Sequence, residues 1–263
     1  MTAVDRPAVA FAAAACTLAG TVAVAVAVFA GPAPDLAGYV SEAGASGSGT
    51  VWPYRIGLLA VAAGQVLLGA ALPRWLRLAS GLLLASAVAT ALSAGVSCRD
   101  RCPLPPFDRV TLADLVHGGA SIAAVAGTVF AILAVAGVPR NLFPAPRGVT
   151  GTGPGPVGGS PSLADEVGAG GPVPALRRLS VVAAAVALPL SAVAGLALLL
   201  VGRGVLTGAV ERLLLLDLAA WGVATGLVLG LAREPVAARD PAAPSGTAGA
   251  GPRRGTPNDS RPG

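Results

Sequence analysis

Six stretches of this chain are long and apolar enough to cross a lipid bilayer, and this restricts its possible folds more than any other feature. A helix of about 20 residues spans the roughly 30 Å hydrocarbon core of a membrane. None of the six stretches alternates apolar and polar residues, so helices are favoured over barrel strands. The predicted spans are approximately residues 8–30, 54–72, 78–97, 113–137, 179–201 and 210–231.

The composition favours the same class of protein. Hydrophobic residues make up 54% of the chain, charged residues only 12%, and the mean hydropathy is +0.74. Soluble domains carry about 25% charged residues, so a soluble fold could not hide this much apolar surface. We therefore predict an all-α polytopic membrane protein, with residues 1–232 forming a bundle of six transmembrane helices and the lipid bilayer as its surroundings. The net charge of +5 does not indicate nucleic-acid binding, because the arginines lie in loops and tails rather than on one basic face.

The first apolar stretch has two interpretations. It is longer than the roughly 7–15 apolar residues of a signal peptide, and Asp5-Arg6 makes a weak positive region before it. We interpret it as an ordinary membrane span. Cleavage stays an alternative, because "AAAAC" at 12–16 resembles a lipoprotein cleavage site.

The distribution of arginines predicts the orientation. If the N-terminus is cytoplasmic, six of the 18 basic residues fall on the outer side, which leaves 12 inside, or nine when the distal tail is discounted. Inner loops of membrane proteins are enriched in arginine and lysine, so we predict a plasma-membrane protein with both termini in the cytoplasm. The six outer arginines are Arg55, Arg99, Arg101, Arg109, Arg203 and Arg212.

Two segments lack any apolar period and are rich in glycine and proline. Residues 139–176 contain "GVTGTGPGPVGGSPS", and residues 233–263 end in "GPRRGTPNDSRPG". Such segments cannot bury enough apolar surface to fold. We predict a disordered cytoplasmic loop and a disordered cytoplasmic tail. Within the fifth span, Pro189 should kink the helix.

Two cysteines lie in the second of three predicted outer loops, which cover residues 31–53, 98–112 and 202–209. Cys98 and Cys102 are separated by three residues, and the outer side of a plasma membrane is oxidising. They form a candidate disulfide, with a pair of ordinary thiols as the alternative. We predict no zinc and no cofactor. A four-ligand zinc site would need further cysteines or histidines beside Cys98 and Cys102, and the chain offers only Cys16 and His117, both of which we expect to be buried.

The remaining polar residues near the outer ends of the spans form a candidate pocket. In the fourth span, Asp114 and His117 share one helical face with Gly118, Ser121 and Thr128, and this face should turn inward. Asp217 is six residues beyond Glu211, so it should lie at a depth similar to that of His117. An alternative is a structural hydrogen-bond network that orders the bundle. The candidate pocket residues are Glu42, Asp114, His117, Glu211, Arg212 and Asp217.

Three functions are compatible with these residues. The leading one is a non-enzymatic role in binding, sensing or envelope organisation, with a lipid head group or small ligand at the outer face. The second is a lipid-directed hydrolase or transferase, in which His117 would act as base or metal ligand beside Glu211. The third is a small proton-coupled transporter, for which Asp217 is the only acid clearly inside a span.

Several short motifs, taken in order, resemble an uncharacterised bacterial membrane-protein family called domain of unknown function 998. They are "SEAG" at 41–44, "SCRDRCP" at 97–103, His117, "GAVERLLLL" at 208–216 and Trp221. The resemblance covers roughly residues 8–232 and implies a six-helix fold without an established activity. Two features depart from the family pattern: the "RDR" that separates the two cysteines, and Asp217 in the last span. The positions that the resemblance marks as typical are Glu42, Cys98, Cys102, His117, Glu211 and Arg212.

Overall fold

The computed structural model describes residues 5–31, 37–99, 102–103, 109–138 and 172–232. Over these residues it is helical and contains no strand. Its six long helices have the length and hydropathy to cross a membrane, which confirms the predicted all-α, six-span architecture. The elements are α1 (Arg6–Phe29), η1 (Val40–Gly44), α2 (Val51–Ala71), η2 (Arg74–Leu76), α3 (Arg77–Gly95), α4 (Leu112–Ala136), α6 (Pro172–Leu200) and α7 (Val205–Leu231).

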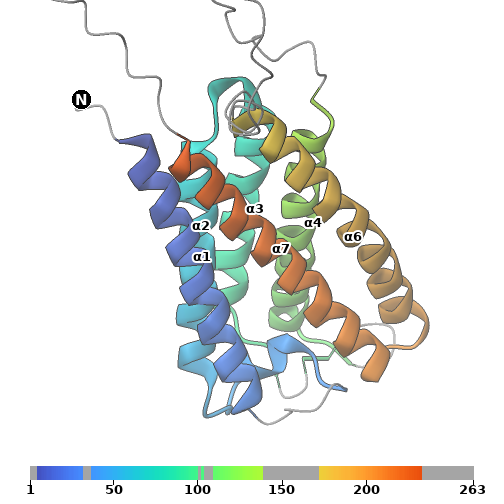
Figure 1. Ribbon diagram of the computed structural model, residues 1–263. Helices are drawn as coiled ribbons and strands as arrows, with labels where there is room; N and C mark the ends of the chain where they lie inside the picture. Colours follow the sequence, from blue (N-terminus) through green and yellow to red (C-terminus); the bar gives the residue numbers. More distant parts are fainter. Residues whose placement is uncertain (1–4, 32–36, 100–101, 104–108, 139–171, 233–263) are drawn as a thin grey trace, which may run out of the picture. The chain divides into compact units, whose positions relative to one another are not determined.

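The long helices form an up-and-down bundle that closes on itself (Figure 1). Each helix packs against the next one along the chain, and α7 returns to pack against α1. The C-terminal ends of α1, α3 and α6 therefore meet the N-terminal ends of α2, α4 and α7 at one end of the bundle. We call this end, with the described connections around residues 37–55, 93–117 and 200–212, the polar end.

Two helix boundaries differ from the sequence prediction. α6 begins at Pro172 rather than near residue 179, so the predicted loop 139–176 is wrong for its last five residues. Proline has no N–H and suits the first turn of a helix, where no intrahelical donor is needed. The rest of that loop and the tail 233–263 lie outside the described residues. α7 begins at Val205, which shortens the third predicted outer loop.

Many small side chains lie inside the bundle, and many large apolar side chains lie outside. On α1, Ala13 is fully buried, whereas Leu18 and Val26 are more than half exposed. The same inversion occurs on α4, where Ala131 is fully buried and Phe130 is 56% exposed. Such an exterior suits lipid chains as solvent, because a soluble protein rarely exposes this much contiguous apolar surface.

Glycines allow α1 to approach two neighbouring helices very closely. A Cβ atom on Gly20 would lie 2.6 Å from the backbone oxygen of Gly57 in α2. On the other side, a Cβ on Gly226 of α7 would lie 2.8 Å from the backbone oxygen of Ala10. Close backbone approach is the usual source of helix association in membranes, since the lipid gives no hydrophobic drive.

Candidate functional site

Most of the predicted pocket residues meet at the polar end. Glu42 lies in η1, Asp114 and His117 in the first two turns of α4, and Glu211 in the second turn of α7. Glu42, Asp114 and His117 are each no more than 4% exposed. Asp217 is on the same helix as Glu211 but six residues deeper, or about 9 Å further along the axis.

Glu42 forms a two-pronged ion pair with Arg203, from the short connection between α6 and α7. Arg203 Nε donates to Glu42 Oε1 at 2.7 Å, and its Nη2 donates to Oε2 at 2.9 Å. The Glu42 side chain is 5% exposed and that of Arg203 is 37% exposed. Oε1 also accepts the backbone N–H of Tyr39 at 3.0 Å. From the sequence, Arg203 counts only as an outer arginine; its position in a very short loop is the available signal of a pairing role.

Glu211 binds the same short helix from a second direction. Its Oε2 accepts the backbone N–H of Val40 at 3.2 Å. Beyond η1, the N–H of Ser46 donates to the carbonyl oxygen of Cys98 at 3.0 Å. The α1–α2 connection is therefore bonded both to α7 and to the chain that follows α3.

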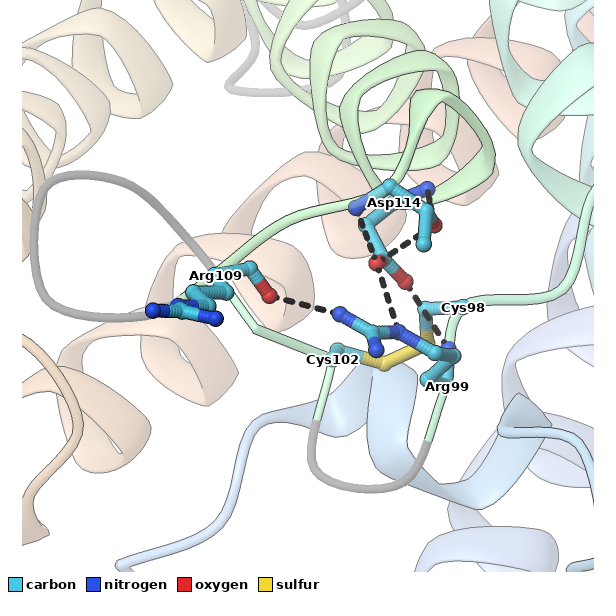
Figure 2. Close-up of polar contacts among 6 residues, drawn as sticks. Cys98, Arg99, Cys102, Arg109 and Asp114 are labelled. Atoms are coloured by element: carbon cyan, nitrogen blue, oxygen red, sulfur yellow. Dashed lines mark hydrogen bonds and ion pairs between the residues drawn. A yellow bond between two sulfur atoms is a disulfide. The ribbon is translucent and has the colours of Figure 1, made fainter.

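Asp114 lies in the first turn of α4, where it caps the helix and also binds the connection that precedes it (Figure 2). Its Oδ2 accepts from the backbone N–H and the hydroxyl of Thr111 at 2.8 and 2.6 Å, which closes a capping box. Arg99 donates to the same carboxylate from its backbone N–H at 2.9 Å and from Nε at 3.1 Å. Arg99 also reaches the carbonyl oxygen of Arg109 at 2.6 Å. This carboxylate is thus fully used in fixing local structure.

A disulfide joins Cys98 and Cys102, whose Cα atoms are 5.0 Å apart (Figure 2). Both residues are buried and pack with Ala45 of the α1–α2 connection. Cys102 has a φ of 43°. This is the left-handed region, which side chains other than glycine adopt rarely and mainly at functional sites and tight turns.

The His117 ring is held by backbone groups at the C-terminal end of α3 and just after it. Nδ1 lies 2.8 Å from the carbonyl oxygen of Val96 and 3.0 Å from that of Ser93. A carbonyl oxygen can only accept, so Nδ1 is a donor, and in the neutral ring Nε2 is the nitrogen with the lone pair. Nε2 is buried and has no hydrogen-bond partner among the described residues. The side chain is 3% exposed.

His117 and the two cysteines form one group. The ligand atoms that Cys98, Cys102 and His117 offer lie within 4.8 Å of one another, and all three residues are buried. In the sequence, the cysteines and the histidine are separate features. Their proximity depends on the path of the chain from α3 to α4, which spacing along the sequence does not determine.

Asp217 and Arg212 stand apart from this group. Asp217 does not pair with His117: its Oδ2 is buried and has no hydrogen-bond partner in the described part of the chain. Arg212 follows Glu211 on α7 and is half-buried. The other four predicted pocket residues form two groups. Glu42 and Glu211 bind around η1, and Asp114 and His117 lie at the start of α4.

Halfway along the bundle, an uncharged network joins three helices. Gln65 Nε2 of α2 donates to Ser86 Oγ of α3 at 3.0 Å and to Thr128 Oγ1 of α4 at 3.2 Å. Its Oε1 accepts from the hydroxyl of Thr90 at 3.3 Å. The helical period predicts Thr128 on the inward face of its helix, whereas Gln65, the amide side chain within the second span, is not among the predicted site residues.

Chemically, the polar end can hold a loop by ion pairs and can offer sulfur and imidazole ligands. Around η1, Glu42 binds Arg203 through both of its oxygens, and Glu211 accepts one backbone N–H, that of Val40. Comparison of the chain with protein-family models, with curated proteins and with solved structures found no match.

Proposed function

We propose that this chain is a non-enzymatic binding or sensing protein of the plasma membrane, with the polar end outside the cell and both termini in the cytoplasm. The arginine distribution supports this orientation, because the fewer arginines belong to the polar end. A disulfide at the polar end fits an oxidising compartment. We also propose membership of the family called domain of unknown function 998, in line with the ordered motifs.

One observation carries the proposal: bonds between distant residues tie the three connections of the polar end together. Two bonds join the α1–α2 connection to the α6–α7 side: Glu42 and Arg203 are 161 residues apart, and Val40 and Glu211 are 171 apart. A third bond, from the N–H of Ser46 to the carbonyl oxygen of Cys98, adds the chain after α3. A ligand that displaced one of these partners would disturb all three connections together. Sensing requires such coupling between a binding event and a shared structural element.

The state of the candidate catalytic groups favours binding over hydrolysis. A nucleophilic mechanism needs a base that touches a nucleophile and a third group that orients the base. Asp114 is used by Thr111 and Arg99 instead of orienting His117. His117 is oriented by carbonyl oxygens at the C-terminal end of α3 and just after it. We therefore do not propose the lipid hydrolase or transferase.

Thiol labelling in intact cells tests the orientation. After mild reduction, a membrane-impermeant maleimide should label Cys98 or Cys102 before the cells are permeabilised. The C98S/C102S variant, which retains Cys16, measures labelling that does not come from the pair. Labelling of the pair only after permeabilisation would contradict the proposed orientation.

Hydrogen–deuterium exchange of the protein in lipid nanodiscs tests the coupling. Arg203→Met removes the partner of Glu42, and we expect faster exchange in η1, in the chain after α3 and at the start of α7. The control is Arg74→Met, a change at the opposite end of the bundle, which should leave the polar end unchanged. Faster exchange confined to η1 would argue against a coupled sensing element.

A further inference from the structure

The three buried residues Cys98, Cys102 and His117 have the composition of a metal site. Their two sulfur atoms and one ring nitrogen of His117 lie within 4.8 Å of one another. Zinc binds thiolate sulfur at about 2.3 Å and imidazole nitrogen at about 2.0–2.1 Å, which puts neighbouring ligands of a tetrahedral ion roughly 3.5–3.8 Å apart. Once they are no longer bonded to each other, the two sulfurs, whose Cα atoms are 5.0 Å apart, can reach such a spacing by side-chain rotation.

The hydrogen bonds of His117 prepare the ring for this role. Metal-binding histidines almost always donate their other ring N–H to a carbonyl or carboxylate, which fixes the tautomer. Nδ1 of His117 makes such bonds to the carbonyl oxygens of Ser93 and Val96. Nε2, by contrast, is buried without a hydrogen-bond partner. A lone pair hidden from water and from protein donors is unfavourable unless something else binds it.

We propose that, when Cys98 and Cys102 are reduced, their thiolates and the free ring nitrogen of His117 bind one zinc(II) or copper(I) ion. Soft thiolate ligands select these two ions over magnesium or calcium. Three protein ligands leave a fourth position open for zinc, as in zinc sites that bind water or substrate. The proposal rests on the proposed function in one respect, because it names the ligand class that the polar end binds.

The charge at the site fits a buried ion. Two thiolates and one zinc(II) sum to zero, which avoids the large penalty of an unpaired charge away from water. With copper(I) one negative charge remains, so zinc(II) is the better match to the charge of this buried group.

Disulfide and metal exclude each other, because both use the same two sulfur atoms. Reduction by a water-soluble phosphine transfers two electrons and two protons to the disulfide, and the phosphine takes up the oxygen of one water molecule. The resulting thiols lose their two protons when the ion binds. The oxidised protein is therefore a folded form of the unaltered chain that should not bind metal.

The test uses full-length protein in detergent, stripped of metal and reduced with the phosphine under nitrogen. Zinc is titrated against a chromophoric chelator in one arm and copper(I) against bicinchoninate in the other. We expect one ion per chain for the reduced wild type and for Cys16→Ser, and none for the oxidised wild type or C98S/C102S. Outer-shell partners alone change metal affinity by about 10–100-fold, so His117→Gln should lower it by at least about 100-fold.

X-ray absorption of the loaded protein gives a second readout. We expect two sulfur ligands and one nitrogen ligand, and loss of the nitrogen in His117→Gln. Equal binding by oxidised and reduced protein, or no stoichiometric binding by the reduced wild type, would overturn the metal site. Either result leaves the labelling and exchange experiments unaffected, so this inference can fail while the coupled sensing element stands.

Discussion

The middle of the bundle and its polar end hold their helices together by different interactions. In the middle, helix backbones approach closely at glycines, and the polar contacts around Gln65 are uncharged. At the polar end, carboxylates bind guanidinium groups that reach solvent, as Glu42 binds Arg203. Charge is expensive near the centre of a membrane and much less so at its surface. The depth of a residue thus selects the interaction that can stabilise it.

The largest predicted effect tests close packing in the middle. In Gly20→Val the new side chain would overlap the backbone of Gly57, which cannot move away without separating α1 from α2. We expect a loss of about 3 kcal/mol in the free energy of unfolding, at the upper end for overpacked cores. Circular dichroism during titration of the detergent-solubilised protein with dodecyl sulfate measures it.

The matched control is Gly81→Val in α3, where a Cβ atom would meet no heavy atom within 4 Å. Because valine is a slightly better helix former than glycine, this variant should be unchanged or more stable by a few tenths of a kcal/mol. Equal losses in both variants would mean that close approach of α1 and α2 is not a main source of stability.

The second prediction tests the ion pair at the polar end. Arg203→Met leaves the carboxylate of Glu42, which is 5% exposed, without its charged partner. Breaking a buried pair costs about 3–5 kcal/mol, but Arg203 is partly solvated, so we expect about 2 kcal/mol. The same unfolding titration measures the loss.

The double variant Glu42→Gln/Arg203→Met isolates the pair. It removes the charge that the single variant leaves buried, so it should recover more than half of the lost stability. The cycle also needs the single variant Glu42→Gln. If the losses of Glu42→Gln and Arg203→Met simply add in the double variant, the pair does not stabilise the polar end by charge.

The third prediction separates capping from ion pairing at the start of α4. Asp114→Ala removes a capping box and the partner of Arg99, and we expect a loss of about 1–1.5 kcal/mol, typical of a helix cap. Arg99→Met removes the ion pair and an exposed hydrogen bond to the carbonyl oxygen of Arg109, from a side chain that is 53% exposed. Asp114 keeps its other donors, so the loss should be about 0.5 kcal/mol or less. Thermal unfolding at low and high salt compares them. If Asp114→Ala and Arg99→Met lost the same stability, and both losses disappeared at high salt, a capping role of Asp114 would be contradicted.

The six helices and the inward face of α4 could be predicted from the sequence, because hydrophobicity and helical period are local properties. The buried positions of Asp114 and His117 follow from that period. The start of α6 was predicted too late, because apolar content alone marks where the hydrocarbon begins and not where a helix begins. Here two prolines and two arginines extend the helix beyond the apolar stretch.

The pairings within the polar end could not be predicted, because they depend on how the bundle closes. Arg203 reaches Glu42 only since α7 returns to α1. His117 meets the cysteines only through the course of the chain between α3 and α4. The same holds for the glycines at 222 and 226. Their spacing does not identify the helix that packs against them, which in the structure is α1 of the same chain.

The smallest predicted effect returns to the middle of the bundle. Gln65→Met keeps the length of the side chain and removes three hydrogen bonds. Ser86 and Thr128 remain bonded to each other at 2.9 Å and to the carbonyl oxygen of Ala124, so no buried hydroxyl loses its last partner. Interhelical hydrogen bonds in membranes contribute about 0.6 kcal/mol on average, and we expect a loss of this size. A loss as large as that of Gly20→Val would mean that hydrogen bonds, and not close backbone packing, hold the middle of the bundle together.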